Sequence, residues 1–213
     1  MTNTVASKVG QAQARILAML LMTIRGTPFL FAGDEMGSEQ VQIPPERIQD
    51  PFEKLMKGFD VGRDPERAPL RWDDTEGGGF TSGEPWLPLS RDRTRNIKAQ
   101  QGDRNSLLNL YHELIALRRE EPCLLQGEYL PRRAQNDVFS FGRRMNETEI
   151  LVGLNIFRRT TALGVGRLRR PIVIDRPRLQ AGKGSGTNPP EAERRSHRQN
   201  RSLSPPRSRR SGN

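Results

Sequence analysis

Residues 6–32 read ASKVGQAQARILAMLLMTIRGTPFLFA, and this stretch decides the fold. Its first part, residues 6–24, consists of good helix formers, and apolar side chains cover nearly the whole circumference of the predicted helix. A helix that is apolar on all sides has to be enclosed by other elements. Gly26 and Pro28 end the helix, and residues 29–32 are a short apolar run typical of a strand covered on both faces. Helix, tight turn and buried strand together make half of an α/β repeat.

A long connection and a second helix follow. Residues 33–104 contain repeated turn signals such as Gly77-Gly78-Gly79 and few long apolar stretches. A connection of this length inside a compact domain is usually functional or disordered. Residues 106–119 carry a one-sided apolar stripe, and Pro122 follows, so we expect an amphipathic helix that opens at Ser106.

After Pro122 the apolar period changes from 3.6 to 2, which indicates strands instead of helices. Three runs alternate in this way and predict strands at residues 127–130, 137–141 and 149–156. Residues 145–148 are the predicted turn between the last two strands. They form a small antiparallel sheet, and three strands are near the minimum for independent stability.

The last part of the chain differs in composition from the rest. Residues 1–160 hold 22 basic and 22 acidic residues, whereas residues 161–213 hold 13 basic and 3 acidic ones. Beyond Phe157 the sequence is dominated by Arg, Pro, Ser and Gly, which cannot bury enough apolar surface to offset chain entropy, so we expect a disordered basic tail over residues 159–213. The net positive charge of the chain therefore does not indicate a nucleic-acid-binding surface on the folded part.

Two alternatives rest on this tail. Its basic residues could neutralise phosphates, which would make the chain a nucleic-acid- or anion-binding protein, but no aromatic residue follows Phe157 to stack on bases. The tail could also come from translation in a shifted frame, in which case the chain is a truncated and frameshifted, non-functional gene product.

Cysteine, histidine and apolar runs exclude several classes of protein. The single Cys123 excludes an internal disulfide framework and a cysteine-based zinc cluster, and two histidines are too few for a His-rich metal centre. The longest apolar run, residues 16–22, is far shorter than a membrane span, and no small-residue cleavage site of a secretory signal follows it. We expect no membrane partner and a cytoplasmic location.

Two carboxylates, Asp34 and Glu35, directly follow the predicted strand. In α/β barrels the C-terminal ends of the strands carry the active site, which favours a catalytic interpretation. Successive strand residues point to opposite faces, however, so these two cannot flank one bond as a glycosidase pair. The alternative is that each satisfies loop amides or closes the barrel.

Residues 62–73, GRDPERAPLRWD, form a dense set of arginines and carboxylates ahead of an indole. Arginine can hold an anion or a sugar hydroxyl in fixed geometry, and a tryptophan can cover the apolar face of a sugar. The alternative is a surface ion-pair cluster.

Four ordered motifs together resemble the bacterial α-glucosidase branch of glycoside hydrolase family 13, which includes oligo-1,6-glucosidases. They are RGTPFLFAGDEMG at residues 25–37, IPPERIQDPFEK at 43–54, GRDPERAP at 62–69 and EPWLPL at 84–89. The resemblance covers roughly residues 5–157.

The resemblance implies an α/β fold, the C-terminal fragment of a (β/α)8 barrel. Residues 1–121 then hold the last helix, strand, substrate loop and helix of the barrel, residues 122–158 begin an antiparallel β domain, and residues 159–213 are the disordered tail. The family's catalytic Asp, Glu and Asp follow strands 4, 5 and 7, upstream of Met1, and no Asn-His-Asp motif appears at the start of this chain. We therefore assign no catalytic residue and expect no hydrolysis by the chain alone.

The resemblance also implies the residues that bind substrate. Arg63 is similar to the arginine that contacts the terminal glucose, with Asp64 and Arg67 as its loop neighbours. Glu35 is similar to the carboxylate after strand 8, and Asp50 lies in a loop near the outer subsites. For Glu35 and Asp50 a structural role is an equal alternative.

The implied ligands are α-linked glucosides or oligosaccharides, with nucleic acid bound only non-specifically through the tail. A separately encoded N-terminal barrel part is a candidate partner. The family's metal ion, where present, lies in the upstream part of the barrel, so we assign no metal and no cofactor. Because a barrel is a closed structure, its isolated last part should leave unpaired edges and exposed apolar faces, which predicts marginal stability.

Overall fold

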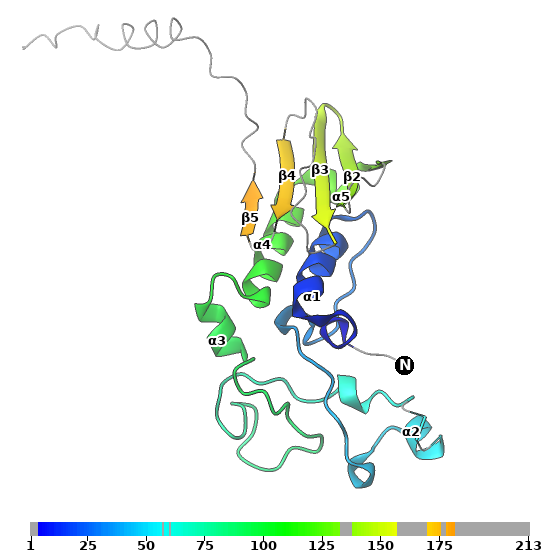
Figure 1. Cartoon of the computed structure of the whole chain (residues 1–213), viewed down its shortest axis with the longest axis vertical. Helices are drawn as coiled ribbons and strands as arrows, with labels where there is room; N and C mark the ends of the chain where they lie inside the picture. Colours follow the sequence, from blue (N-terminus) through cyan, green and yellow to red (C-terminus); the bar gives the residue numbers. More distant parts are fainter. Residues whose placement is uncertain are drawn as a thin grey trace, which may run out of the picture. The chain divides into compact units, whose positions relative to one another are not determined.

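The computed structural model describes residues 4–56, 58–59, 61–132 and 138–156, and the strand backbone of residues 170–175 and 178–181 (Figure 1). The described residues fall within one compact unit, residues 1–182, and residues 183–213 lie outside the part of the chain that the structure describes. The expected disorder of the tail therefore lies mostly outside the part of the chain that the structure describes.

Helix α1 (Val5–Thr23) confirms the expected first helix. Thr4 caps its N-terminus by accepting a hydrogen bond from the Ser7 amide, and Gly10, with φ of 76°, interrupts the helical backbone. The predicted enclosure on all sides is incomplete, because Val9 and Leu17 are each 37% exposed.

Residues 29–32 are not a strand, so this prediction is wrong for the described structure. Instead of being buried, Phe29 is 83% exposed and Phe31 is 66% exposed. A parallel strand is stabilised by neighbours on its edges and by layers on its faces. Among the described residues no strand lies beside this segment, because every strand belongs to the sheet that begins at residue 128.

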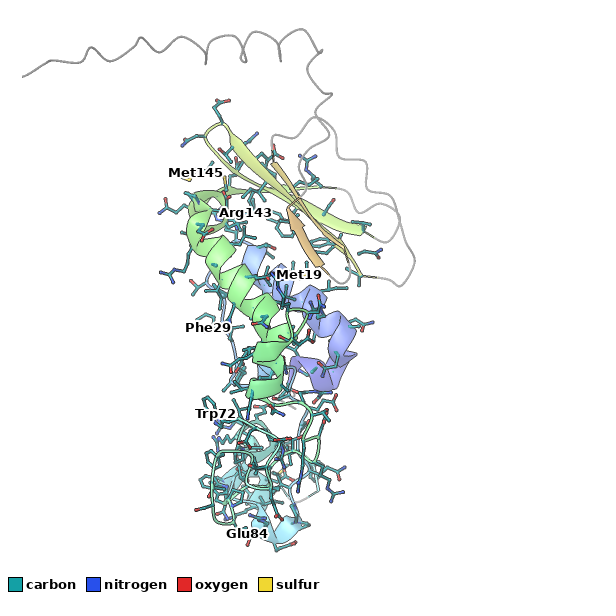
Figure 2. The ribbon with its side chains drawn as sticks, turned by 90° about the vertical axis from the view of Figure 1, so that its left-hand side faces the viewer. Met19, Phe29, Trp72, Glu84, Arg143 and Met145 are labelled. Atoms are coloured by element: carbon teal, nitrogen blue, oxygen red, sulfur yellow. The ribbon has the colours of Figure 1, made fainter. Side chains whose placement is uncertain are left out.

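The long connection carries only short helical turns. In chain order they are η1 (Asp34–Met36), η2 (Pro45–Arg47), α2 (Pro51–Leu55), η3 (Asp64–Glu66) and α3 (Ile97–Gly102). Figure 2 labels Trp72 and Glu84 among these loops. The segment is therefore held by local turns and side-chain contacts instead of regular sheet or helix layers.

Helix α4 (Leu107–Glu120) confirms the second predicted helix. The Ser106 hydroxyl accepts a hydrogen bond from the Asn109 amide at 3.1 Å, which caps the N-terminus as the sequence indicates. Pro122 does end this helix, but it also occupies the first turn of a short one, α5 (Pro122–Gln126), a position where a missing amide hydrogen costs nothing.

The three predicted strands are present as an antiparallel set. They are β1 (Glu128–Pro131), β2 (Val138–Met145) and β3 (Thr148–Asn155). Met145 pairs with Thr148 across a two-residue turn in which Asn146 has φ of 53°. Asparagine tolerates this left-handed conformation better than most residues, so the hairpin forms where the sequence places it.

The sheet continues beyond the predicted three strands. Strand β4 (Arg170–Asp175) pairs in parallel with β3, and β5 (Arg178–Ala181) pairs antiparallel with β4. At these two stretches the structure differs from the expected disorder. The physical reason is the run Ile172-Val173-Ile174, because β-branched residues favour strands even inside a segment rich in arginine.

One apolar core joins the helices to the sheet. Its buried members come from α1, α4, α5, β2 and β3, and include Ile16, Met19, Met22, Leu110, Leu114, Leu124, Phe141, Ile150, Val152 and Leu154. The core thus crosses residue 121, where the sequence analysis places a boundary between the barrel part and the β domain. That boundary stays a prediction.

Two buried arginines bind the C-terminal end of α1. Arg118 of α4 donates to the carbonyls of Met22, at 2.6 Å, and Gly26, at 2.5 Å, and Arg143 of β2 donates to that of Thr23 at 2.8 Å. Figure 2 labels Arg143 at the sheet. Burial lowers the pKa of both guanidinium groups, and the carbonyl oxygens at the helix end supply the partial negative charge that they face.

Among the described residues, no helix combines the length and the apolar character that crossing a membrane requires.

Candidate functional site

Two buried carboxylates, Asp50 and Asp64, organise the loop around α2 and η3. Asp50 caps α2 by accepting a hydrogen bond from the Phe52 amide at 2.8 Å. Asp64 accepts from the amides of Gln49 and Asp50 at 2.5 and 2.7 Å through a single oxygen, Oδ2. Both side chains are only 2% exposed, so these two aspartates lie beneath the surface of the loop.

Two arginines lie over this pair of aspartates. Arg63 Nε is 3.6 Å from Asp50 Oδ2, and Arg67 Nη1 is 3.7 Å from the same oxygen and 3.9 Å from Asp64 Oδ1. The Arg63 side chain is 63% exposed and that of Arg67 is 47% exposed. We call Asp50, Arg63, Asp64 and Arg67 the arginine–aspartate cluster.

The charges of the arginine–aspartate cluster balance. The hydrogen bond from the Phe52 amide is the main cause that lowers the pKa of Asp50, and the nearby Arg63 charge adds to the effect. Asp50 therefore stays ionised at neutral pH. The two exposed arginines bring N–H donors, and their formal charges match those of the two aspartates, which suits an uncharged ligand rich in hydroxyl groups.

Glu35 is not brought into this cluster. Its Oε2 accepts a hydrogen bond from the Gly33 amide at 2.8 Å. The neighbouring Asp34 accepts from the Val5 amide at 3.2 Å and from the Phe31 amide at 3.3 Å. Both carboxylates thus bind backbone amides, in line with the alternative that the sequence left open for them.

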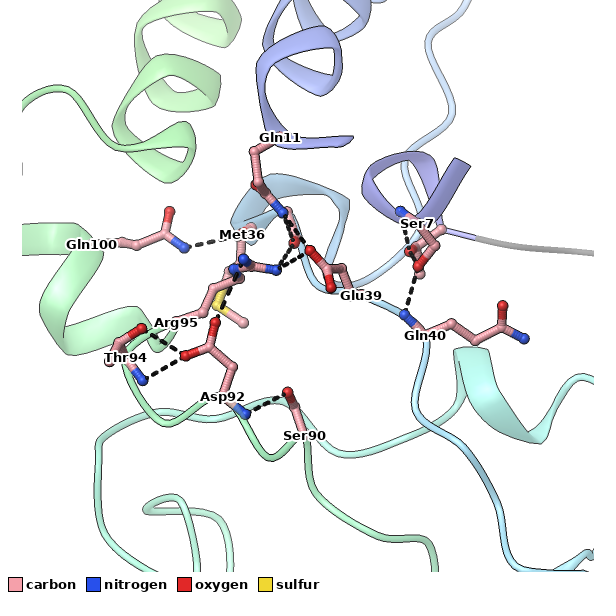
Figure 3. Close-up of polar contacts among 12 residues, drawn as sticks. Ser7, Gln11, Met36, Glu39, Gln40, Ser90, Asp92, Thr94, Arg95 and Gln100 are labelled. Carbon is pink, nitrogen blue, oxygen red and sulfur yellow. Dashed lines mark hydrogen bonds and ion pairs between the residues drawn. The ribbon is translucent and has the colours of Figure 1, made fainter. Parts of the chain in front are cut away.

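A polar network, which the sequence analysis missed, holds the loop after Asp34 and Glu35. Gln11 of α1 donates to the Gly37 carbonyl at 2.7 Å, and Arg95 donates to the same carbonyl at 3.0 Å and pairs with Glu39 at 2.9 Å (Figure 3). Gln100 of α3 donates to the Met36 carbonyl at 2.8 Å. These partners are far apart in the chain, so no local sequence signal could have identified them.

Glu53 and Arg71 are further buried residues that the sequence did not single out within their motifs. The Glu53 carboxylate accepts hydrogen bonds from the amides of Val61 and Gly62 at 2.7 and 2.8 Å, which fixes the loop segment that leads to Arg63. Arg71 donates to the Ser90 carbonyl at 2.7 Å. Both lie inside or next to the quoted motifs, but only the structure distinguishes them from surface charges.

A hollow of about 960 Å³ adjoins the arginine–aspartate cluster. Its lining includes Ser7, Glu39, Gln40, Ile43 and Asp64. Among the described residues, no group of three His, Cys, Asp or Glu side chains could hold a metal ion. Of the arginine–aspartate cluster, Asp64 lines this hollow, and Arg63 and Arg67 do not.

A family model described as "Alpha amylase, catalytic domain" matches residues 2–127. The oligo-1,6-glucosidase of Halalkalibacterium halodurans is 35% identical over 167 residues, which cover 70% of this chain and 30% of the relative. A probable alpha-glucosidase of Rhizobium meliloti is 37% identical over 146 residues, or 68% of this chain and 26% of the relative.

The crystal structure of an alpha-glucosyl transfer enzyme matches with a TM-score of 0.65 and 32% identity, over 72% of this chain and 30% of that chain. Trehalulose synthase from Pseudomonas mesoacidophila MX-45 matches with a TM-score of 0.60 and 30% identity, over 69% of this chain and 32% of that chain. The chain thus spans about 30% of the length of the proteins that it resembles.

Proposed function

The chain belongs to the α-amylase catalytic-domain family, and from this membership we propose that it binds α-linked glucosyl units through Arg63 and Arg67. The observation that carries the proposal is a pair of exposed arginines, Arg63 and Arg67, that form ion pairs of 3.6–3.9 Å with two buried aspartates. Both guanidinium groups lie near carboxylates and still have N–H donors that a sugar hydroxyl could accept from, which supports recognition at this loop. Asp50 and Asp64 act from below as positioning residues.

The names of the relatives support the ligand class. Oligo-1,6-glucosidase and alpha-glucosidase are both named for the hydrolysis of α-glucosidic bonds. The resemblance of Arg63 to the family's glucose-contacting arginine points the same way. An uncharged glucoside also matches the balanced charge of the arginine–aspartate cluster.

We further propose that these 213 residues do not hydrolyse the bound sugar by themselves. Retaining hydrolysis requires two carboxylates about 5 Å apart on either side of the scissile bond, one of them with a raised pKa. Asp50 and Asp64 do not fit this requirement, because both are buried and both accept hydrogen bonds from backbone amides. The pKa of Asp50 is also lowered. Asp34 and Glu35 are engaged with amides as well.

The binding proposal can be tested by titrating the purified chain with isomaltose and with methyl α-glucoside, followed by calorimetry or ligand-observed NMR. We expect binding by the unchanged chain and its loss in Arg63→Leu. Arg119→Leu, which changes an exposed arginine on α4, is the matched control and should bind as before. Equal binding by Arg63→Leu and the unchanged chain would contradict the proposal.

A further inference from the structure

Trp72 and Phe80 are two exposed aromatic side chains at the two ends of one turn in the long connection. Trp72, which Figure 2 labels, is 53% exposed, and Phe80 is 52% exposed. Among the described residues, neither ring packs against another aromatic ring. Single exposed apolar side chains are common, but two from one turn form a patch that indicates a ligand. We call residues 72–80 the aromatic turn.

Backbone hydrogen bonds close the aromatic turn and hold its two ends together. The Trp72 amide donates to the Gly78 carbonyl at 2.7 Å, and the Phe80 amide donates to that of Gly77 at 3.1 Å. A Cβ added to Gly79, whose φ is 63°, would lie 3.1 Å from the Cβ of Trp72. Phe80 follows Gly79 directly, so both aromatic residues are attached to neighbouring parts of a fixed backbone. A fixed backbone loses little conformational freedom when a ligand binds.

The Asp73 carboxylate supplies a hydrogen-bond acceptor next to Trp72. Its Oδ1 accepts hydrogen bonds from the Thr75 amide at 3.0 Å and from the Thr75 hydroxyl at 2.5 Å. Its Oδ2 accepts no hydrogen bond from the residues that the structure describes. The hydroxyl of Thr75 is the main cause that lowers the pKa of Asp73, so the carboxylate is ionised at neutral pH. Asp73 Oδ2 is therefore open to a hydroxyl group of a ligand.

An aromatic face next to an open carboxylate oxygen fits a pyranose sugar. The C–H groups on one face of a sugar ring pack on the electron-rich face of an indole, and the hydroxyl groups donate to a carboxylate. A cationic ligand fits less well, because Arg71 and Lys98 already place positive charge near Asp73. A protein partner fits less well too, since a stable protein interface needs a much larger patch than two side chains.

Trp86, the other tryptophan of the chain, lacks these neighbours although it is 61% exposed. Its carbonyl accepts a hydrogen bond from Arg47 Nη2 at 2.9 Å. The carboxylate of Glu84, two residues earlier, is paired with Arg47 Nη1 at 3.0 Å. Exposure alone therefore does not distinguish the two indoles, but their surroundings do, and Trp86 is a matched control for Trp72.

We propose that the aromatic turn is a second sugar-binding surface, where a glucosyl unit lies on the Trp72 indole and donates a hydroxyl hydrogen bond to Asp73 Oδ2. Phe80 borders this surface. The choice of an α-linked oligosaccharide as the ligand rests on the sugar-binding function proposed above. The aromatic turn shares no residue with the arginine–aspartate cluster, so the two sites can be tested separately.

The test titrates the Trp86→Ala variant of the 213-residue chain with maltohexaose, because Trp72 is then the only indole. We expect a saturable change in tryptophan emission. Calorimetry compares further variants with the unchanged chain: Trp72→Ala should weaken maltohexaose binding about tenfold, and Trp86→Ala should bind as before. Asp73→Asn should also weaken binding, whereas Glu76→Gln, which changes an exposed carboxylate of the same turn, should not.

Trp72→Phe keeps an aromatic ring and should keep most of the binding, and circular dichroism of each variant shows whether the chain stays folded. Loss of binding in Trp72→Ala is then not confused with unfolding. No emission change with maltohexaose, or equal binding by Trp72→Ala and the unchanged chain, would overturn the inference. An emission change with hexa-arginine but not with maltohexaose would overturn it too, because the aromatic turn would then bind cations.

Arg63→Leu separates this inference from the proposed function. Maltohexaose binding that depends on Trp72, without isomaltose binding that depends on Arg63, rejects the proposed function and supports the aromatic turn as a sugar-binding surface. Isomaltose binding that depends on Arg63, without maltohexaose binding that depends on Trp72, does the reverse.

Discussion

At the scale of single residues, Asp50 is a carboxylate of the arginine–aspartate cluster whose pKa is lowered in the folded chain. The Phe52 amide is the largest cause of its lowered pKa, and a group whose pKa is lowered by folding stabilises the folded state at pH values above its ordinary pKa. This contribution is fully present above the unfolded value of about 4 and is lost as the pH falls through the lower folded value.

We therefore predict that the melting temperature of the chain falls as the pH is lowered below about 4, and that Asp50→Asn removes part of this dependence. Thermal melts between pH 3 and pH 7, followed by circular dichroism, test it. An unchanged acid dependence in Asp50→Asn would show that other carboxylates control the transition.

Arg143 is a second residue whose role is clear from its contacts. It is fully buried and donates to the carbonyls of Thr23 and Gly127 at 2.8 and 3.0 Å. Arg143→Met leaves both oxygens without this donor, and each unsatisfied buried group costs about 1–3 kcal/mol, so we predict destabilisation by about 3 kcal/mol.

Arg144→Met is the control for Arg143→Met, because Arg144 is the next residue of β2 and forms an exposed pair with Glu128. Exposed ion pairs contribute little, so this variant should change the free energy of unfolding by less than about 1 kcal/mol. Urea titrations of both variants give the free energies of unfolding. Equal losses of stability would contradict the prediction that the buried contacts of Arg143 stabilise the fold.

The sequence indicated part of the site but not its arrangement. One motif contains Arg63, Asp64 and Arg67, and the structure places them together with Asp50, which precedes that motif by about a dozen residues. For Glu35 the sequence left open whether it contacts a sugar or satisfies loop amides, and the structure shows it apart from the cluster, accepting a hydrogen bond from the Gly33 amide. The role of these residues in sugar binding stays a proposal.

At the scale of elements, the kink of α1 depends on Gly10. Its φ of 76° is a conformation that side chains with a Cβ rarely adopt, although the space around it is free apart from Gln13 Oε1 at 4.0 Å. We predict that Gly10→Ala destabilises the chain by about 1 kcal/mol through backbone strain alone.

Gly102, at the end of α3, is the matched position for Gly10→Ala. It has no positive φ and no atom within 4 Å of an added Cβ, so Gly102→Ala should be neutral or stabilise by up to about 1 kcal/mol. Thermal and chemical denaturation of both variants measure the difference. A stabilising Gly10→Ala would mean that the helix is straight in solution.

The elements that the sequence predicted correctly are those fixed by local signals. The start of the second helix at Ser106 and the hairpin turn at Asn146 need only neighbouring residues. Residues 29–32 failed as a strand because a parallel strand depends on neighbours from elsewhere in the chain or from another one. Strand β4 was missed because its short apolar run is surrounded by arginine, proline and aspartate.

At the scale of the whole molecule, the match to the family and to solved relatives confirms the expected α/β, barrel-type fold for about 70% of the chain. The shared core of α1, α4 and the sheet explains how a part of such a fold keeps a buried interior. The exposed side chains of Phe29 and Phe31 show which surface this core leaves uncovered. This uncovered surface and the arginine–aspartate cluster are formed by different residues.

The central claim is that the carboxylates described here hold loops and arginines in place and do not break the sugar linkage. The most direct measurement is glucose release from maltose and isomaltose by the purified 213-residue chain, with a mock purification to measure contaminating glucosidase. We predict no release above that of the mock sample. Sustained release that follows the chain through purification and disappears in Asp50→Asn or Asp64→Asn would contradict the claim.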